Sequence, residues 1–521
     1  MIRYTPQSQL SLEGFETPFV QQLDKNNRWV KLAQAIPWDK LAGVYYKKMD
    51  SSFGAPSISA RMVIGAVIIK HMLNIDDREV IEQIKENMYL QYFTGMSSFT
   101  TQAPFDASLM VSIRYRLGQQ TMEAFNRLVL QEAGIIPYSD EGSADDTENR
   151  DEHNNPASSA TDQTIQAEQG TIPANSGTLM VDATVAEQQI EYPTDLKLLN
   201  EGRQQLERMI QQLCKAGGLQ QPRMYKQVAR SRYLTIAKKK NKTHKQIRRG
   251  IRQQLQYVQR DLKYLTRLIE EQSQLRDVLD KRDWKLLRVI HELHRQQQEM
   301  YGENKHSIQD RIVSIYQPHV RPMPRGKDRV ATEFGSKQLI MQKDGYTYIH
   351  SIEWDNFNEG TQLKSCVEIY KEIYGCYPEK VSADKLFGSK ANRDYLKEKQ
   401  ICFVGKQLGR PPKQTARQKR ELRKQMAQRN EIEGKFGQGK NAYGLQKIKA
   451  RMQQTSQSWI MSIYFIMNLV KLMQGSFFDF INCVRQIFIR IQILFVADKF
   501  AVLKNRANFF SRPYLSRTHV K

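Results

Sequence analysis

The strongest constraint on the fold is one strand-like segment that lies far from its nearest counterpart. The segment SGTLMVDATV is apolar and β-branched, and we expect it to form a buried strand that ends at Asp182. The next such segment, KQLIMQKDGYTYIHSIEW, begins at Lys337 and predicts two strands joined at a Lys-Asp-Gly turn. A sheet that contains both segments must therefore accommodate a long helical segment between them.

The residues from 196 to 298 have the periodicity of long helices. Apolar side chains from Ile247 to Ile269 step by 4, 4, 3, 4, 3 and 4 positions, which is heptad spacing. Two or three antiparallel helices would satisfy this pattern. Further along, LKSCVEIYKEIYG predicts a helix, KVSADKLF a strand that ends at Asp384, NRDYLKEK a helix, ICFVG a strand, and a last helix carries Glu433.

The positive charge of the chain is concentrated in two runs. Lys and Arg number 79 against 55 Asp and Glu, a net charge of +24. Fifteen Lys and Arg against one acid lie between Arg223 and Arg267, and fourteen against three acids lie between Lys406 and Arg451. Because such dense cations repel one another unless phosphates neutralise them, we expect a nucleic-acid partner. A solvated coiled coil is the alternative for the first run.

Several classes of protein are disfavoured. The five cysteines are odd in number and form no CxxC pair, which is unlike a disulfide framework or a zinc finger and fits a reducing cytosol. We expect no signal peptide and no membrane span. We also expect no nucleotide cofactor, since neither a Walker loop nor a GxGxxG motif occurs. The apolar stretches after 457 are interrupted by charges such as Lys471 and Arg485, so they predict buried amphipathic helices.

An acidic, apolar-poor stretch predicts a disordered linker over 137–176 after a helical unit over 1–136. Within this unit, Asp76 is the expected N-cap of the helix that begins DREVIEQ. A later helix carries Arg114 and Arg116. Several short helices, the last one basic, suggest a DNA-binding domain of the helix-turn-helix kind. A helical packing domain with solvated arginines is the alternative.

Three acids at the ends of predicted elements could form a metal site. Asp182 and Asp384 end strands, and Glu433 lies on a helix. Carboxylates are the ligands that Mg²⁺ takes from proteins, and a pair of such ions clamps both oxygens of a phosphoryl displacement. Arg429, Glu433 and Lys440 follow the spacing R-x3-E-x6-K, which places the arginine and the glutamate on one helical face.

Five phrases of the sequence resemble the motifs of a known family. They are VDATVAEQQIEYPTD, RPMPRGKDRVATEFGSK, WDNFNEG, SADKLFGSKANRDYL and RNEIEGKFGQGKNAYGLQKIKAR. In this order they are similar to the motifs of bacterial insertion-sequence transposases with a DDE catalytic triad, of the IS-five type. The stretch from Pro56 to Gly118 resembles the helical domain that precedes the catalytic core in that family.

The resemblance implies an α+β fold with an RNase H-like mixed-sheet core, in which Asp182, Asp384 and Glu433 hold two Mg²⁺ ions that Mn²⁺ can replace. It implies cut-and-paste DNA transposition: water cleaves the element ends, and the freed 3′-OH attacks target DNA. The implied partners are terminal inverted repeats and target DNA, bound by a homodimer in the synaptic complex, in a bacterial cytoplasm near the nucleoid. An inactive or domesticated DNA-binding protein of the same fold, or an RNase H-like nuclease, is the alternative.

The signature around the third acid is matched with one departure. The resemblance implies that Arg429 and Lys440 contact DNA or orient the acid. Met426 stands where the family has a tyrosine, which places a tyrosine-specific contact in doubt. Glu431 is a rival for the third acid, although the phrase I-E-G-K-F and the spacing to Lys440 favour Glu433.

The expected DNA-binding residues are basic side chains from all three regions: Arg114, Arg116, Lys238, Lys239, Lys240, Arg248, Arg249, Arg410, Arg429 and Lys440. Arg410 lies in LGRPPK, which predicts either a minor-groove Arg-Pro hook or a simple loop. Glu333, Lys337 and Glu359 lie in family-like phrases and predict either the lining of the active-site cleft or structural roles. The expected domains are a DNA-binding unit over 1–136, a linker over 137–176, a catalytic core over 177–195 and 311–475, a basic helical insertion over 196–310 and a helical tail over 476–521.

Overall fold

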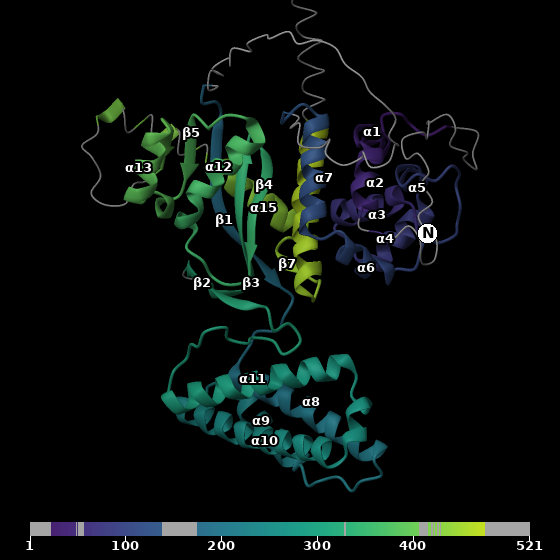
Figure 1. The fold of residues 1–521 in the computed structure, drawn as a ribbon, viewed down its shortest axis with the longest axis vertical. Coiled ribbons are helices and arrows are strands. Elements are labelled where there is room, and N and C mark those ends of the chain that lie inside the picture. The colour runs from purple at the N-terminus through teal and green to yellow at the C-terminus, as the bar shows by residue number, and fades with distance from the viewer. Residues whose placement is uncertain are drawn as a thin grey trace, which may run out of the picture.

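The computed structural model of the chain describes residues 22–47, 49, 57–137, 174–327, 330–405, 415–417, 420, 423–424, 427 and 429–474. A central sheet lies between two helical parts (Figure 1). The N-terminal helices lie to one side of this sheet, and a separate helical bundle extends from one end of it. The predicted linker falls almost entirely outside the described residues, and the predicted tail over 476–521 falls wholly outside them.

Seven strands form one mixed sheet in the described part of the chain. They are β1 (Thr178–Gln188), β2 (Arg321–Lys327), β3 (Val330–Lys343), β4 (Tyr346–Glu353), β5 (Lys380–Ala383), β6 (Cys402–Val404) and β7 (Lys447–Ile448). Their order is β2-β3-β1-β5-β6, with β4 also paired to β3 and β7 to β1. Since β1 is antiparallel to β3 and parallel to β5, the isolated strand of the sequence is the centre of the sheet.

The predicted hairpin is confirmed, and the predicted end of the first strand is wrong. Between β3 and β4, Asp344 and Gly345 have φ values of +51° and +79°, the left-handed backbone that tight two-residue hairpin turns require. By contrast, β1 does not end at Asp182 but continues to Gln188. It pairs with β3 and then with β7 along this length, and these partners are invisible in the local sequence.

Strand β2 was not expected from its sequence. It contains Pro322 and Pro324, and proline cannot donate a hydrogen bond to a neighbouring strand. The strand pairs only with β3, so it lies at an edge of the sheet. An edge strand tolerates proline because one side of its backbone needs no partner.

Both faces of the sheet are covered by helices: α12 (Leu363–Tyr374), α13 (Lys390–Glu398), α15 (Asn430–Ala442) and a helix over 453–474. Leu179 and Val181 of β1 are buried on the face that α12 and α13 cover. Met180 of β1 is buried on the other face, together with Ile432 of α15 and residues of the helix over 453–474. Side chains of β1 therefore alternate between two apolar cores.

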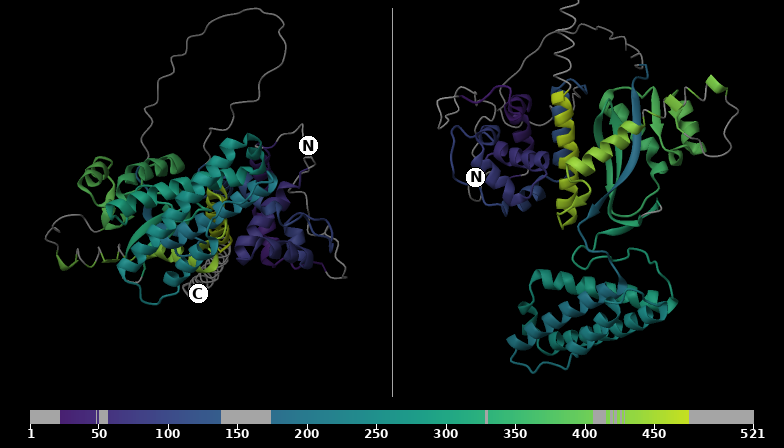
Figure 2. Two further views of the ribbon diagram at one scale, coloured as in Figure 1. Left: turned by 90° about the horizontal axis from the view of Figure 1, so that it is seen from below. Right: turned by 180° about the vertical axis from the view of Figure 1, so that it is seen from behind.

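Seven helices precede the sheet in the described residues: α1 (Arg28–Ala35), α2 (Trp38–Tyr46), α3 (Ala60–Leu73), α4 (Asp77–Glu86), α5 (Met88–Phe93), α6 (Leu109–Arg116) and α7 (Gln119–Glu132). The predicted cap is confirmed, since Asp76 Oδ1 accepts hydrogen bonds of 3.0 Å from the backbone N–H groups of Arg78 and Glu79. These helices share one hydrophobic core with the helix over 453–474, which lies beside α7 (Figure 2). The N-terminal unit and the sheet are therefore packed together.

The helix over 453–474 confirms the expected buried helix, but it is buried on all sides from 458 to 469 rather than on one face only. Its residues Ile460, Ile463 and Ile466 are fully buried between the N-terminal helices and the sheet. Within the residues that the structure describes, no helix is both long enough and apolar enough to cross a membrane.

Four helices, rather than the predicted two or three, form the bundle between β1 and β2: α8 (Asp195–Ala216), α9 (Lys226–Ala237), α10 (His244–Glu271) and α11 (Lys281–Glu303). The C-cap Gly217 ends α8, and a capping box of Thr243 and Gln246 starts α10. The segment between these two boundaries contains the additional helix α9. The heptad positions from Leu255 to Ile269 are buried in the bundle's own core, as expected.

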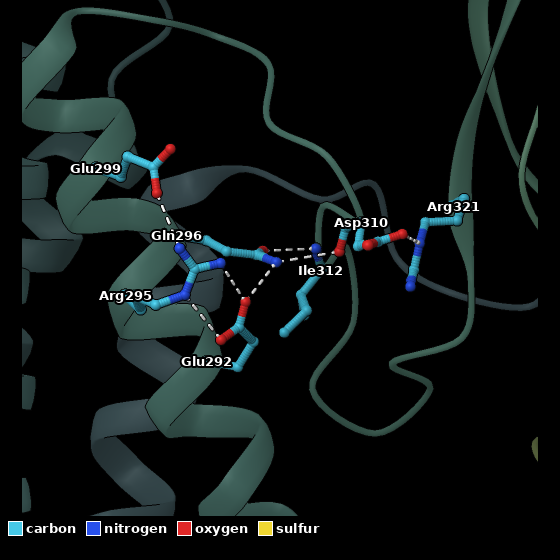
Figure 3. A network of polar contacts seen from close by, with 7 residues as sticks. All are labelled: Glu292, Arg295, Gln296, Glu299, Asp310, Ile312 and Arg321. Carbon is cyan, nitrogen blue, oxygen red and sulfur yellow. Dashed lines mark hydrogen bonds and ion pairs between the residues drawn. The ribbon is translucent and has the colours of Figure 1, made fainter.

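A buried glutamine joins this bundle to the sheet (Figure 3). The Gln296 side chain of α11 is 1% exposed; it accepts a hydrogen bond of 3.0 Å from Ile312 N–H and donates one of 3.1 Å to the Asp310 carbonyl. The Asp310 carboxylate lies 3.8 Å from the Arg321 guanidinium at the start of β2. The segment that enters the sheet is thus held against α11.

Candidate active site

The two predicted aspartates lie side by side on neighbouring parallel strands. Val181 of β1 is in register with Ala383 of β5, and Asp182 and Asp384 are the next residues along. Residues in register on adjacent strands point to the same face of a sheet. The Asp182 side chain is partly buried in the sheet, whereas Asp384, just beyond β5, is exposed.

An arginine joins these strand ends to the helix that carries the third predicted acid. Arg429 lies at the N-terminal end of α15, and its guanidinium is 3.3 Å from Asp384 Oδ1 and 2.6 Å from Glu433 Oε1. Arg429 and Glu433 are four residues apart on the helix, so one turn places them together as the spacing predicted. The structure therefore brings two of the three predicted acids, Asp384 from the end of β5 and Glu433 from α15, to one guanidinium.

The electrostatics of Asp182 reflect its surroundings. The pKa of Asp182 is raised to about 6, mainly by burial and also by the negative charges of Asp384 and Glu359. A hydrogen bond of 2.9 Å from the Ala183 backbone N–H and the positive charge of Arg429 act in the opposite direction. Asp182 thus lies in a site with an excess of carboxylates, where positive charge is stabilising.

The rival acid points elsewhere. Glu431 also lies in the first turn of α15, but its Oε1 is 3.3 Å from the position that a Cβ on Gly345 would occupy, in the turn between β3 and β4. Its negative charge raises the pKa of Lys435, against the larger effects of burial and Lys471, which lower it. Lys440, in the last turn of α15, is partly buried. Of the two glutamates, Glu433 is the one that contacts Arg429.

A fourth carboxylate lies near the site and carries its own cation. Glu359 begins the short 3-10 helix η2 (Glu359–Gln362), and its carboxylate is 2.6 Å from Lys337 Nζ. The same ammonium group donates hydrogen bonds to the Phe357 carbonyl at 2.8 Å and to Asn356 Oδ1 at 3.1 Å. Both charged side chains are mostly buried, so the pair fixes the loop before α12 against β3.

Two of the arginines expected to bind DNA have partners within the protein. Arg114 donates two hydrogen bonds to the Asp77 carboxylate, at 2.8 and 2.7 Å, and its side chain is 7% exposed. Arg248 donates hydrogen bonds to Asn304 Oδ1 at 2.7 Å and to the Tyr301 carbonyl at 3.0 Å, which ties α10 to the end of α11. Their contacts with DNA stay predictions, and the Arg114 guanidinium is held by Asp77 in the protein interior.

The remaining basic residues are more accessible. Arg116, Lys238, Lys239, Lys240 and Arg249 are exposed. The predicted hook and the departure from the family signature, at Arg410 and Met426, lie outside the described residues.

The described residues contain no group of three or more His, Cys, Asp and Glu side chains arranged to hold a metal ion. In the predicted triad, the Arg429 guanidinium bridges Asp384 and Glu433 and supplies the neutralising charge. The donor chemistry nevertheless fits a hard divalent cation, since the acids offer carboxylate oxygens and Asp182 is destabilised by neighbouring negative charge.

Two family models match separate parts of the chain. Residues 18–116, which include α1 to α6, match a model described as "Transposase domain (DUF772)". Residues 381–470, which include Asp384 and Glu433, match one described as "Transposase DDE domain". Two separate segments of the chain are therefore similar to transposase domains. Asp182 lies outside both matched segments, on the strand beside the one that precedes Asp384.

One curated relative matches the chain over a short length. The chain is 38% identical over 97 residues to "Uncharacterized protein ORF8 in nfe locus" of Rhizobium meliloti. The match covers 18% of the chain and 45% of that relative, so the chain spans less than half of the relative's length. No solved structure matches the chain significantly.

Part of the site was not visible in the sequence. The spacing of Arg429 and Glu433 predicted their contact, but nothing local indicated that the same arginine reaches Asp384. Glu359 was a candidate through its phrase alone, and its electrostatic effect on Asp182 follows from the fold. Neither the contact of Arg429 with Asp384 nor the effect of Glu359 on Asp182 had a local sequence signal, because both depend on distant segments coming together.

Proposed function

We propose that this chain is a DDE transposase that cuts and joins DNA at a site formed by Asp182, Asp384 and Glu433. The observation that carries the proposal is that Arg429 contacts both Asp384 and Glu433, while its charge also acts on Asp182 of the neighbouring strand β1. Acids that lie 202 and 49 residues apart in sequence are thus gathered around one arginine, where the end of β5 lies beside β1.

The proposed core is RNase H-like, with α8 to α11 as an insertion after its first strand. Three features support this: β1 is central, an antiparallel β3–β4 hairpin lies on one side of it, and parallel β5 and β6 lie on the other. The insertion is proposed because α8 to α11 have a core of their own and lie between β1 and β2 in the chain.

The three carboxylates are the proposed ligands of two Mg²⁺ ions, which Mn²⁺ could replace. When bound, such cations activate water and stabilise the charge that develops on the phosphate. The protein's part is to hold its carboxylates close to one another, on β1, just beyond β5 and on α15. Arg429 is then released from Asp384 and is positioned to contact a DNA phosphate, which is the role proposed for it and for Lys440.

The reaction proposed is cut-and-paste transposition. Water cleaves the phosphodiester at the element end, releasing a 3′-OH, and that hydroxyl attacks a target phosphodiester and displaces its 3′-oxygen. Because two ends must be joined to one target, we propose a homodimer in the synaptic complex. The exposed Arg116, Lys238, Lys239, Lys240 and Arg249 are the proposed contacts to terminal repeats and target DNA.

The test is cleavage of a duplex that carries the DNA flanking the coding region, with full-length protein and Mg²⁺. Asp182→Asn, Asp384→Asn and Glu433→Gln should each lower the cleavage rate by more than the roughly 100-fold that loss of an outer-shell metal partner costs. Binding of the duplex should be retained, because the neutral side chains keep the shape of the site.

Glu431→Gln is the matched control, since it removes an exposed acid two residues from Glu433. It should leave the rate within a few-fold of the unsubstituted protein. Equal loss in Glu431→Gln and Glu433→Gln would contradict the assignment of the third acid. Binding without any cleavage by the unsubstituted protein would support a DNA-binding protein that has lost activity.

A further inference from the structure

A basic cleft lies in the helical bundle, away from the three acids. It has a volume of about 850 Å³ and is formed between α8 and α9. Its charged lining residues are Arg203, Glu207, Lys226, Arg230, Lys238 and Lys239. Five of these six carry a positive charge, so the cleft is suited to an anion.

The floor of the cleft is electrically neutral. Arg203 and Glu207, one turn apart on α8, form a buried ion pair in which the arginine is 1% exposed. Arg203 also donates a hydrogen bond of 2.8 Å to Asn200 Oδ1. This arginine is therefore occupied by its own helix, and the charge available to a ligand comes from the walls.

Four cations line the walls of the cleft. Lys226 is half-buried, and Arg230, Lys238 and Lys239 are exposed. In the part of the chain that the structure describes, none of these four side chains has a hydrogen bond, ion pair or ring contact. Each carries its full charge into the cleft or to its rim.

Other cations of the same run are used internally. Arg232 donates a hydrogen bond of 2.8 Å to the Tyr257 hydroxyl, and Arg260 one of 2.7 Å to Asp261. Arg248, as described above, ties α10 to α11. The Lys and Arg residues of the basic run thus include cations that hold the bundle together and cations that face the cleft.

The spacing of the wall cations fits a sugar–phosphate backbone. Lys226 and Arg230 lie one turn apart on α9, and Lys238 is the C-cap residue of this helix, about 18 Å from Lys226 along the axis at 1.5 Å per residue. Each strand of a DNA duplex offers one phosphate per 3.4 Å of axis, or about five phosphates over that length. The polar side chains of Gln227 and Ser231 line the same cleft and could donate hydrogen bonds to phosphate oxygens.

We propose that the α8–α9 cleft is a sequence-independent binding site for the backbone of duplex DNA, in which Lys226, Arg230, Lys238 and Lys239 contact phosphates. The choice of DNA as the polyanion rests on the proposed function. Two of these residues, Lys226 and Arg230, are not part of the DNA-binding set expected from the sequence. The site holds DNA at the bundle while the acids act at the sheet.

The experiment measures binding of full-length protein to a fluorescent duplex of arbitrary sequence between 50 and 200 mM salt. The test protein carries Lys226→Gln, Arg230→Gln, Lys238→Gln and Lys239→Gln together. Four lost phosphate contacts should make the slope of log affinity against log salt less negative by about 3.6, since each contact contributes about 0.9. The fall in affinity over this salt range should then be about 150-fold smaller than for the unsubstituted protein.

The matched control removes four exposed cations from α11 of the same bundle: Lys281→Gln, Arg282→Gln, Lys285→Gln and Arg288→Gln. It should keep the original slope. An equal change in both proteins, or no change in the cleft variant, would overturn the proposal. A Lys226→Arg, Lys238→Arg and Lys239→Arg protein should bind as the unsubstituted chain does, which separates charge from loss of folding.

Parallel titrations with single-stranded RNA and with anionic lipid vesicles complete the test. A cleft variant that loses RNA or vesicle binding but keeps duplex binding would also overturn the proposal. Failure of the proposed function would give a different result. The unsubstituted protein would not cleave DNA, but the cleft variant would still bind the duplex with a less negative salt slope than the unsubstituted protein.

Discussion

At the residue scale, the charged form of Asp182 lowers the stability of the fold that contains it. Its carboxylate is partly buried and lies near the charges of Asp384 and Glu359, so the charged form is disfavoured. Arg429 offsets this only in part, because the pKa of Asp182 is still raised to about 6. A site that is to attract a cation requires such an excess of negative charge.

This situation predicts a pH-dependent gain of stability in Asp182→Asn. The pKa of Asp182 rises from 3.8 to about 6 on folding, so the folded state binds more protons than the unfolded state between these values. Stability therefore falls as pH rises through this window, and asparagine removes that loss. In EDTA, the melting temperature of Asp182→Asn should match that of the unsubstituted protein near pH 4 and exceed it above pH 7.

Asp394→Asn, at an exposed position of α13, is the control and should show no such trend. A variant that melts at the same temperature as the unsubstituted protein at both pH values would show that burial of Asp182 carries no energetic cost.

At the element scale, β3 organises the sheet. It pairs with β1 along one edge, and its other edge pairs first with β2 and then with β4. Gly335 lies where β1, β2 and β3 meet, in register with both Glu187 and Arg321. A Cβ at this position would lie 1.9 Å from the Ala186 carbonyl oxygen, so only glycine allows the strands to approach this closely.

We expect Gly335→Ala to destabilise the protein by about 1–3 kcal/mol or more, because the strands must move apart to admit the methyl group. Chemical denaturation measures this loss. Gly302→Ala is the control: it lies in α11 with open space around its Cα, and alanine should stabilise the helix by about 0.5–1 kcal/mol. Opposite signs for the two glycines are the expected outcome, and two changes of the same sign would contradict it.

At the scale of the whole molecule, one asparagine connects three parts of the chain. Asn468, 1% exposed in the helix over 453–474, accepts a hydrogen bond of 2.9 Å from Thr347 N–H of β4. It donates bonds of 2.7 Å to the Thr347 carbonyl and 2.8 Å to Asn126 Oδ1 of α7. The N-terminal unit and the sheet are thus held in one orientation by a buried polar contact.

Asn468→Leu should therefore loosen the N-terminal unit. The substitution removes the acceptor of the Thr347 N–H and leaves the Thr347 carbonyl with the longer bond of 3.5 Å from Asn126 Nδ2, and a buried group left without a partner costs about 1–3 kcal/mol. Hydrogen–deuterium exchange should accelerate in α7 and β4, while the α8–α11 bundle, which has its own core, should be unaffected. Asn126→Ala removes its bonds with Asn468 and Thr347 but keeps both bonds between Asn468 and the Thr347 backbone, so it should have a smaller effect. Uniform acceleration across the chain would argue against a local connection.

Local sequence predicted the elements well where a pattern is complete within one segment. The hairpin of β3 and β4, the helix α12, the cap at Asp76 and the heptad positions of α10 were all confirmed. The prediction failed for the length of β1, for the edge strand β2 and for the number of helices in the bundle. In the first two cases, pairing with a distant strand overrides the local composition.

Sequence by itself determined the residue types of the site, the strand and helix that carry them, and the run of positive charge. It did so because periodicity, capping and helical spacing are local properties of a chain. Only the tertiary structure decided which charges are available: Arg114 is consumed by Asp77, whereas Lys226 and Arg230 face a cleft. The same fold placed Asp384 beside Asp182 and Arg429. These outcomes depend on which distant segments come into contact, because a charged side chain is paired or free according to its neighbours in space.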